Sequence, residues 1–109
     1  MKKIAVLLAL LASSLAHAAI IDSPTSKIKM MGSYNQYAGG DVYFAIENPA
    51  GICTHGYWLN KADAGFGANM AMLLSAYHAK SNVMIYAHND QIWPGSTGTY
   101  CKLYSVVLN

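Results

Sequence analysis

The first 18 residues constrain this chain most, because they have the pattern of an export signal that is cleaved from the mature protein. Two lysines precede an apolar run from Ile4 to Leu11, and Ala16-His17-Ala18 follows as a small-residue sequence. A basic start, an apolar centre and an A-x-A site are the three parts of a bacterial secretory signal peptide. We therefore expect cleavage after Ala18 and a secreted or periplasmic mature protein of residues 19–109.

The charge of the chain belongs to this signal. The formal net charge is +2, from seven Lys and five acids with no Arg, and two of the Lys lie in the predicted signal. The mature segment is therefore neutral and lacks the basic surface that nucleic-acid binding requires. After residue 18, no apolar run approaches the roughly 20 residues that span a bilayer. We expect one small domain that binds no nucleic acid and does not span a membrane.

The two cysteines, Cys53 and Cys101, both lie in the exported segment. Export places them in an oxidising compartment, where a pair of cysteines normally forms a disulfide. Closing a loop of 48 residues stabilises a fold by about 4 kcal/mol in the chain-entropy model. A reactive thiol or a metal site is the other interpretation, but a C-x-x-C pair and a His at ligand spacing are both missing.

Hydrophobic periodicity predicts a mainly β domain with one helix. Residues 19–25 form a loose leader, and the Met31-Gly32 step suggests a bulge in the first strand. Phe66, Met70, Leu73, Leu74 and Tyr77 make one helical stripe, which Lys80 and Asn82 bring to an end. Residues 88–98 form a polar loop. The expected elements are strands 26–34, 41–47 and 52–59, a helix at 66–80, and strands 83–87 and 100–108.

This β-β-β-α-β-β order is that of the OB-fold, a five-stranded Greek-key barrel. OB-folds bind oligosaccharides or oligonucleotides through their loops and one strand face, and the neutral charge favours sugars here. A bridge from Cys53 to Cys101 would tie the third strand to the last. Residues 19–109 are thus expected to form a single OB-fold-like binding domain.

The strongest candidate for ligand contact is the loop that holds Trp93. Asn89, Asp90 and Gln91 precede it closely, and sugars stack on aromatic rings while amide and carboxylate groups bind their hydroxyls. The alternative is that Trp93 anchors the loop onto the barrel or lies in a subunit contact. Among the eight tyrosines, Tyr34 and Tyr37 beside the first turn are the least constrained by packing; four others are expected in the core or sheet: Tyr43, Tyr57, Tyr77 and Tyr86.

Metal and catalytic chemistry have little support in the sequence. His55, His78 and His88 are 23 and 10 residues apart, spacings that fit neither a helical pair nor a finger. Residues 95–98 do not form a nucleophile elbow, and no paired carboxylates stand out. We expect no metal, no cofactor and no enzymatic activity.

Several segments together resemble one family. They are Tyr43-Phe44-Ala45-Ile46-Glu47 with a Cys soon after, the helix with Met70, Leu73, Leu74 and Ala76, Val83-Met-Ile-Tyr86, and Trp93-Pro94. Over about residues 26–94 the chain resembles the B subunits of subtilase cytotoxin and typhoid toxin. Those are small exported OB-fold proteins that form ring pentamers, bind sialylated host glycans and accompany a catalytic A subunit.

The resemblance also implies site residues. A serine at the start of the first strand contacts sialic acid in that family, which corresponds to Ser26 here. A sugar-contacting tyrosine falls at Ala87 or, with a shift of one residue, at Tyr86. The resulting hypothesis is a non-catalytic glycan- or glycoprotein-binding protein, expected as a homopentamer. The alternative is a periplasmic module that binds or inhibits a protein without recognising sugar.

Overall fold

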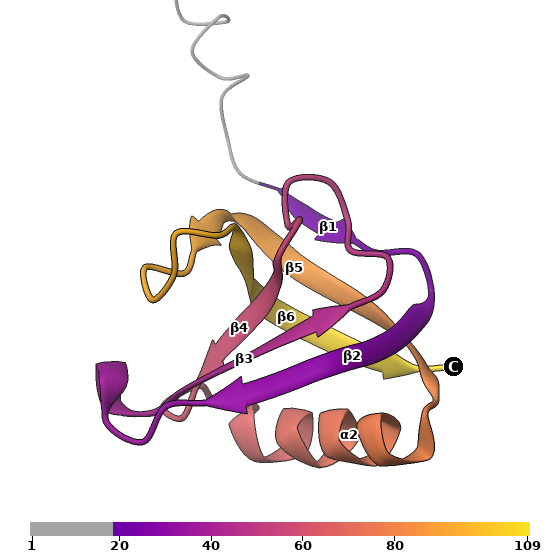
Figure 1. Cartoon of the computed structure of the whole chain (residues 1–109), viewed down its shortest axis with the longest axis horizontal. Helices are drawn as coiled ribbons and strands as arrows, with labels where there is room; N and C mark the ends of the chain where they lie inside the picture. The colour runs from indigo at the N-terminus through magenta and orange to yellow at the C-terminus, as the bar shows by residue number, and fades with distance from the viewer. Residues whose placement is uncertain (1–18) are drawn as a thin grey trace, which may run out of the picture.

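The computed structural model describes residues 19–109, so the predicted signal peptide lies outside the described residues. In this part of the chain a mainly β fold carries a single α-helix (Figure 1), as the sequence predicts. The β-β-β-α-β-β order is confirmed, with one additional short strand before it. The elements are β1 (Ile20–Asp22), β2 (Ser26–Ser33), the short 3-10 turn η1 (Tyr37–Gly39), β3 (Asp41–Ile46), β4 (Gly56–Asn60), α2 (Phe66–Ala79), β5 (Asn82–Ile92) and β6 (Tyr100–Leu108).

The sheet closes on itself. β2 pairs antiparallel with β3, and β3 with β4; β4 then pairs parallel with β6, which returns antiparallel to β5. β5 completes the ring by pairing with the start of β2. β1 lies along the same edge of β5, beyond the point where β2 leaves it. The result is the predicted OB-fold-like small barrel, with α2 packed across one end (Figure 1).

The core follows the alternation that the sequence shows. Val42, Phe44 and Ile46 of β3 belong to the buried core cluster, and Tyr43 and Ala45 between them lie on the other face of the strand. The helix contributes Leu73 and Ala76, both fully or almost fully buried. Two residues of the predicted helical stripe, Leu74 and Tyr77, are instead exposed, because the helix contacts the barrel along the narrower line through Leu73 and Ala76.

The strands differ from the prediction in one additional strand, in the start of β4 and in the end of β5. The predicted leader contains β1, a strand that cannot be recognised from the sequence because three residues are too few to show an alternating pattern. Just after β1, the Ser23 N–H donates a hydrogen bond to the Ile85 carbonyl oxygen. The third strand begins at Gly56, because residues 50–54 turn with hydrogen bonds from Cys53 and Thr54 N–H. β5 continues to Ile92, because its pairing with β6 resumes at Ile92 after an irregularity that begins at His88. The irregularity in β2 lies between Ile28 and Met30, slightly before the predicted Met31-Gly32 step.

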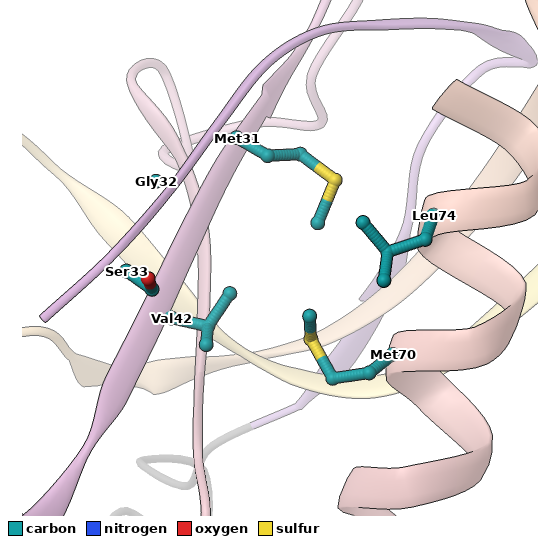
Figure 2. A pocket seen from close by; sticks show the side chains of 6 residues that line it. All are labelled: Met31, Gly32, Ser33, Val42, Met70 and Leu74. Atoms are coloured by element: carbon teal, nitrogen blue, oxygen red, sulfur yellow. The ribbon is translucent and has the colours of Figure 1, made fainter. Parts of the chain in front are cut away.

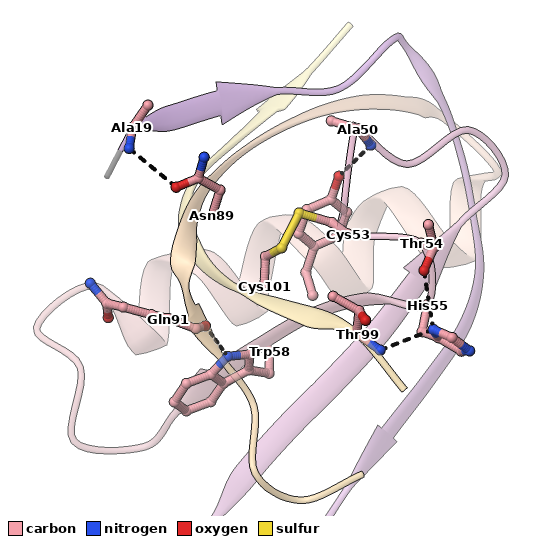
Figure 3. The surroundings of a disulfide bond; sticks show 11 residues. Ala19, Ala50, Cys53, Thr54, His55, Trp58, Asn89, Gln91, Thr99 and Cys101 are labelled. Atoms are coloured by element: carbon pink, nitrogen blue, oxygen red, sulfur yellow. Dashed lines mark hydrogen bonds between the residues drawn. A yellow bond between two sulfur atoms is a disulfide. The ribbon is translucent and has the colours of Figure 1, made fainter. Parts of the chain in front are cut away.

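The predicted disulfide is present. Cys53 and Cys101 are both fully buried, with their Cα atoms 5.4 Å apart, inside the range that a disulfide spans (Figure 3). Cys53 lies in the turn before β4, and Cys101 lies in β6. The bridge therefore ties the β3–β4 connection to the last strand, a link between segments that are distant in the sequence.

Tyr57 gives the barrel a predicted dependence on high pH. Its side chain is fully buried and its hydroxyl oxygen accepts a hydrogen bond from the Ala50 N–H at 3.1 Å. Burial raises the pKa of Tyr57 above its ordinary value of 10.0. The folded protein thus keeps this proton to a higher pH than the unfolded chain, so this contribution to stability is lost as the pH rises from about 10 through the folded pKa. Urea unfolding across this range should show a steeper loss of stability in the wild type than in Tyr57→Phe, and equal slopes would contradict the assignment.

Candidate functional site

Trp93 lies at the centre of a group of aromatic side chains on the outside of the barrel. The Tyr43 ring stacks on it with centroids 5.2 Å apart and an interplanar angle of 21°. The Tyr100, Tyr34 and Tyr37 rings meet the indole at 5.4, 5.8 and 6.3 Å. These four tyrosines and Trp93 are called the aromatic cluster below. They come from the β2–β3 connection, β3, the segment between β5 and β6, and the start of β6, so the fold assembles the cluster from distant parts of the sequence.

Local geometry explains how this cluster forms. Tyr43 follows Val42 in β3 and therefore points to the outer face. After β5 the chain folds back over that face, where the Trp93 N–H donates to the Tyr100 carbonyl oxygen at 2.9 Å. Small residues leave room for the rings: a Cβ at Gly32 would overlap the Tyr43 ring, and one at Gly95 would overlap the Trp93 indole.

A buried carboxylate holds Trp93 in place. The indole Nε1–H donates to Asp41 Oδ2 at 2.8 Å, and the Asn60 side-chain amide donates to Asp41 Oδ1 at 2.7 Å. Asp41 is 1% exposed and Trp93 is 3% exposed. Both carboxylate oxygens have a neutral donor, which satisfies the buried charge without an ion pair. Trp93 is therefore a fixed base for the tyrosines around it.

Lys102 on β6 is held by two neighbouring side chains. Lys102 Nζ lies 2.8 Å from Asp63 Oδ1 and 4.2 Å from the centre of the Trp58 ring. Asp63 in turn accepts the backbone N–H of Asn60 at 2.8 Å. The Trp58 indole donates to the Gln91 carbonyl oxygen at 3.0 Å (Figure 3). This side of the barrel is thus fixed by polar contacts among its own residues.

The part of the cluster open to solvent is a pair of tyrosines. Tyr34 and Tyr37 are 44% and 41% exposed, and their ring centroids are 5.6 Å apart. The loop that carries them is closed by a hydrogen bond from the Tyr34 N–H to the Asp41 carbonyl oxygen. Gly39 and Gly40 turn this loop with φ values of 79° and 110°, a region that favours glycine. The two amphipathic rings are therefore held against the buried Trp93 side chain before any ligand binds.

A pocket of about 480 Å³ lies beside Tyr34, and is called the loop pocket below. Its volume falls in the usual range for small-ligand sites. Polar groups and apolar side chains both reach it, as such sites require. Its walls are Ser33, Tyr34, Asn35, Gly39, Gly40, Val42, Lys61, Phe66 and Met70.

The structure places the predicted loop residues at the end of β5. Trp93 is buried, so it anchors its loop onto the barrel and offers no free ring face to a ligand. Asn89 is partly buried, and its Oδ1 accepts the Ala19 N–H at 3.1 Å (Figure 3). Asp90 and Gln91 are exposed. These polar residues belong to a strand rather than to the predicted loop.

The two residues suggested by the resemblance lie elsewhere. Ser26 is 4% exposed, pairs with Val83 and uses its Oγ to accept the Asn48 N–H at 3.0 Å. Tyr86 is partly buried and pairs with Asp22. Val83 pairs with Leu108 and Ile92 with Cys101, seven residues apart on β6, which is roughly 23 Å along a strand. Ser26 and Trp93 therefore stand near opposite ends of β5, and the six predicted residues do not form one surface.

The exposed pair and its support are only partly visible in the sequence. A glycine-glycine turn flanked by tyrosines marks Tyr34 and Tyr37 as loop residues, which is why they stand out as the least constrained. The Asp41 to Trp93 hydrogen bond joins residues 52 positions apart, and neither residue type predicts the other as its partner.

Residues 19–109 contain no group of three His, Cys, Asp or Glu side chains close enough together to hold a metal ion. Within the same residues, the structure has no helix with the length and apolarity to cross a membrane. No family model, curated protein or solved structure matches the chain. The chemistry of the exposed tyrosines and the loop pocket is therefore the basis for inferring function.

Proposed function

We propose that the mature domain is an exported, non-catalytic carbohydrate-binding protein whose ligand contacts Tyr34 and Tyr37. The observation that carries this proposal is the pair of half-exposed tyrosine rings held on the buried Trp93. Sugar C–H groups stack on aromatic faces, and tyrosine hydroxyls bind sugar hydroxyls. Because Trp93 already holds the two tyrosine rings in place, little conformational entropy is lost when the sugar binds.

The position in the barrel supports the same function. OB-folds bind oligosaccharides through the connection between their first two strands and the connection between their last two. In this barrel those connections are the β2–β3 loop, which carries Tyr34 and Tyr37, and the β5–β6 loop, which carries Trp93. Asn35 and Lys61 border the adjacent loop pocket and add polar groups for sugar hydroxyls or a sugar carboxylate.

The resemblance to toxin B subunits extends the proposal. It implies that the ligand is a host glycan or glycoprotein, including sialylated ones, that the mature protein is secreted or periplasmic, and that a catalytic A subunit accompanies a ring pentamer. The buried disulfide is compatible with an oxidising compartment. We expect light scattering of the mature protein to report a pentamer. A monomer would contradict the ring and leave the sugar site unaffected.

The sugar site is tested by alanine substitutions on a glycan array. Tyr34→Ala and Tyr37→Ala should each weaken binding about tenfold, or roughly 1.4 kcal/mol, because each removes one stacking surface. Tyr104→Ala is the matched control, since Tyr104 is an exposed tyrosine on β6 outside the cluster. It should bind as tightly as the wild type.

Two outcomes would contradict the proposal. Binding that survives both cluster substitutions would place the sugar elsewhere. A wild-type protein that binds no glycan, yet retains a partner from a cell extract after glycosidase treatment, would support the protein-binding interpretation instead.

A further inference from the structure

A second, apolar hollow lies between the sheet and the helix. Side chains from β2, β3 and α2 converge on it: Met31, Val42, Met70 and Leu74 point toward one another across the space (Figure 2). Its volume is about 210 Å³, and Leu74 at its edge is 43% exposed. This hollow is called the methionine groove below. Methionine side chains are flexible and polarizable, so two of them can adapt to an apolar ligand of irregular shape.

The methionine groove lies next to the loop pocket. Ser33, Val42 and Met70 line both. Moving from the helix toward the β2–β3 loop, the lining therefore changes from methionine and leucine to the polar groups of Asn35 and Lys61. Acidic side chains line neither space. An apolar space and a more polar space therefore lie side by side, and the more polar one borders Tyr34.

We propose that the ligand is a glycoside with an apolar substituent, whose sugar lies at the loop pocket and whose alkyl or acyl group fills the methionine groove. This inference rests on the proposed function, because the sugar contact at Tyr34 places the substituent. A free sugar would leave the groove empty, whereas an alkyl chain would remove its apolar walls from water. The three lining residues that the two spaces share place them close enough together for one amphiphilic ligand to reach both.

The probes are matched methyl and octyl β-glycosides of glucose, galactose and N-acetylglucosamine, used below the micelle concentration. Binding is followed by NMR of the mature protein with 13C-labelled methionine methyl groups. At least one octyl glycoside should bind tenfold or more tightly than its methyl partner and shift the Met31 and Met70 signals. The signal of Met72, which is exposed on α2 and does not line the groove, should remain unchanged.

The variant Leu74→Glu tests whether the alkyl group lies in the methionine groove. The residue is exposed, so the fold should tolerate the carboxylate, and a melting curve checks this. The variant should bind octyl and methyl glycosides with equal affinity, and its affinity for the methyl glycosides should equal that of the wild type. Met72→Glu adds the same charge to another exposed position of the helix. This variant should still bind octyl glycosides more tightly than methyl glycosides.

Four results would overturn the inference. Equal affinity for methyl and octyl glycosides would do so while leaving the sugar site intact. If octanoate bound as tightly as the octyl glycosides, the groove would bind an alkyl chain without a sugar. If none of the octyl glycosides bound, the groove would not hold the substituent of a glycoside. Self-association abolished by Leu74→Glu, without an octyl effect, would assign the groove to a second copy. The glycan array decides the proposed function separately.

Discussion

Replacing Trp93 with alanine is expected to lower the free energy of unfolding by about 3–5 kcal/mol, the range for truncating a large buried aromatic residue. The indole is 3% exposed and contacts four tyrosines. Its loss would also leave Asp41 Oδ2 without the donor that it has at 2.8 Å. Tyr34 and Tyr37 would lose their base, so sugar binding should fall below detection even where the protein is folded. Urea unfolding and the glycan array measure the two effects on the same sample.

Trp93→Phe separates packing from hydrogen bonding. Phenylalanine keeps a ring beneath the tyrosines and removes the Nε1–H donor, so the loss of stability should be about 1–3 kcal/mol, the cost of leaving a buried acceptor unpaired. Sugar binding should then be largely retained. Unchanged stability in Trp93→Ala, or full sugar binding by that variant, would contradict the role of Trp93 as the base of the cluster.

Removing the disulfide is expected to cost about 4 kcal/mol in the double variant Cys53→Ala/Cys101→Ala, because the unfolded chain regains the freedom of a long loop. The bridge spans 48 residues and joins the β3–β4 connection to β6. A domain of this size has a total stability of about 5–15 kcal/mol, so the loss is a large fraction of it. Urea unfolding of the oxidised wild type and the double variant measures the difference.

Reduction provides the control for this second experiment. Dithiothreitol should lower the unfolding midpoint of the wild type to near that of the double variant, and should leave the double variant unchanged. Equal midpoints for the oxidised wild type and the double variant would show that the bridge contributes little to stability.

The fold could be predicted from the sequence because each main element carries its own periodic pattern. Val42, Phe44 and Ile46 alternate with outward residues, and this alternation is enough to predict β3. The helix shows a 3.6-residue period, although Leu74 and Tyr77 made its apolar stripe wider than the buried face. β1 could not be predicted, because three residues beside a proline have no periodic signal. The extension of β5 to Ile92 depends on pairing with β6. The polar residues of this segment are typical of a loop, so the sequence does not indicate that pairing.

The site could be predicted only in part, for a related reason. The sequence identifies Trp93 as unusual, yet two roles fit an aromatic residue among amides. The choice between them depends on Asp41, whose carboxylate reaches Trp93 only after the barrel has closed. Ser26 and Tyr86 came from a resemblance, and the fold places Ser26 far from Trp93 along β5. Tyr34 and Tyr37 are visible as loop tyrosines, but their proximity to each other and to Trp93 is a property of the tertiary structure.

The sugar site is tested most directly by an NMR experiment on residues 19–109 with 13C-labelled tyrosine rings, bound to the sugar that gives the strongest array signal. We expect intermolecular NOEs between sugar C–H protons and the rings of Tyr34 and Tyr37, and none to the exposed rings of Tyr77 and Tyr104. NOEs confined to Tyr86, or a bound sugar that contacts neither Tyr34 nor Tyr37, would contradict it.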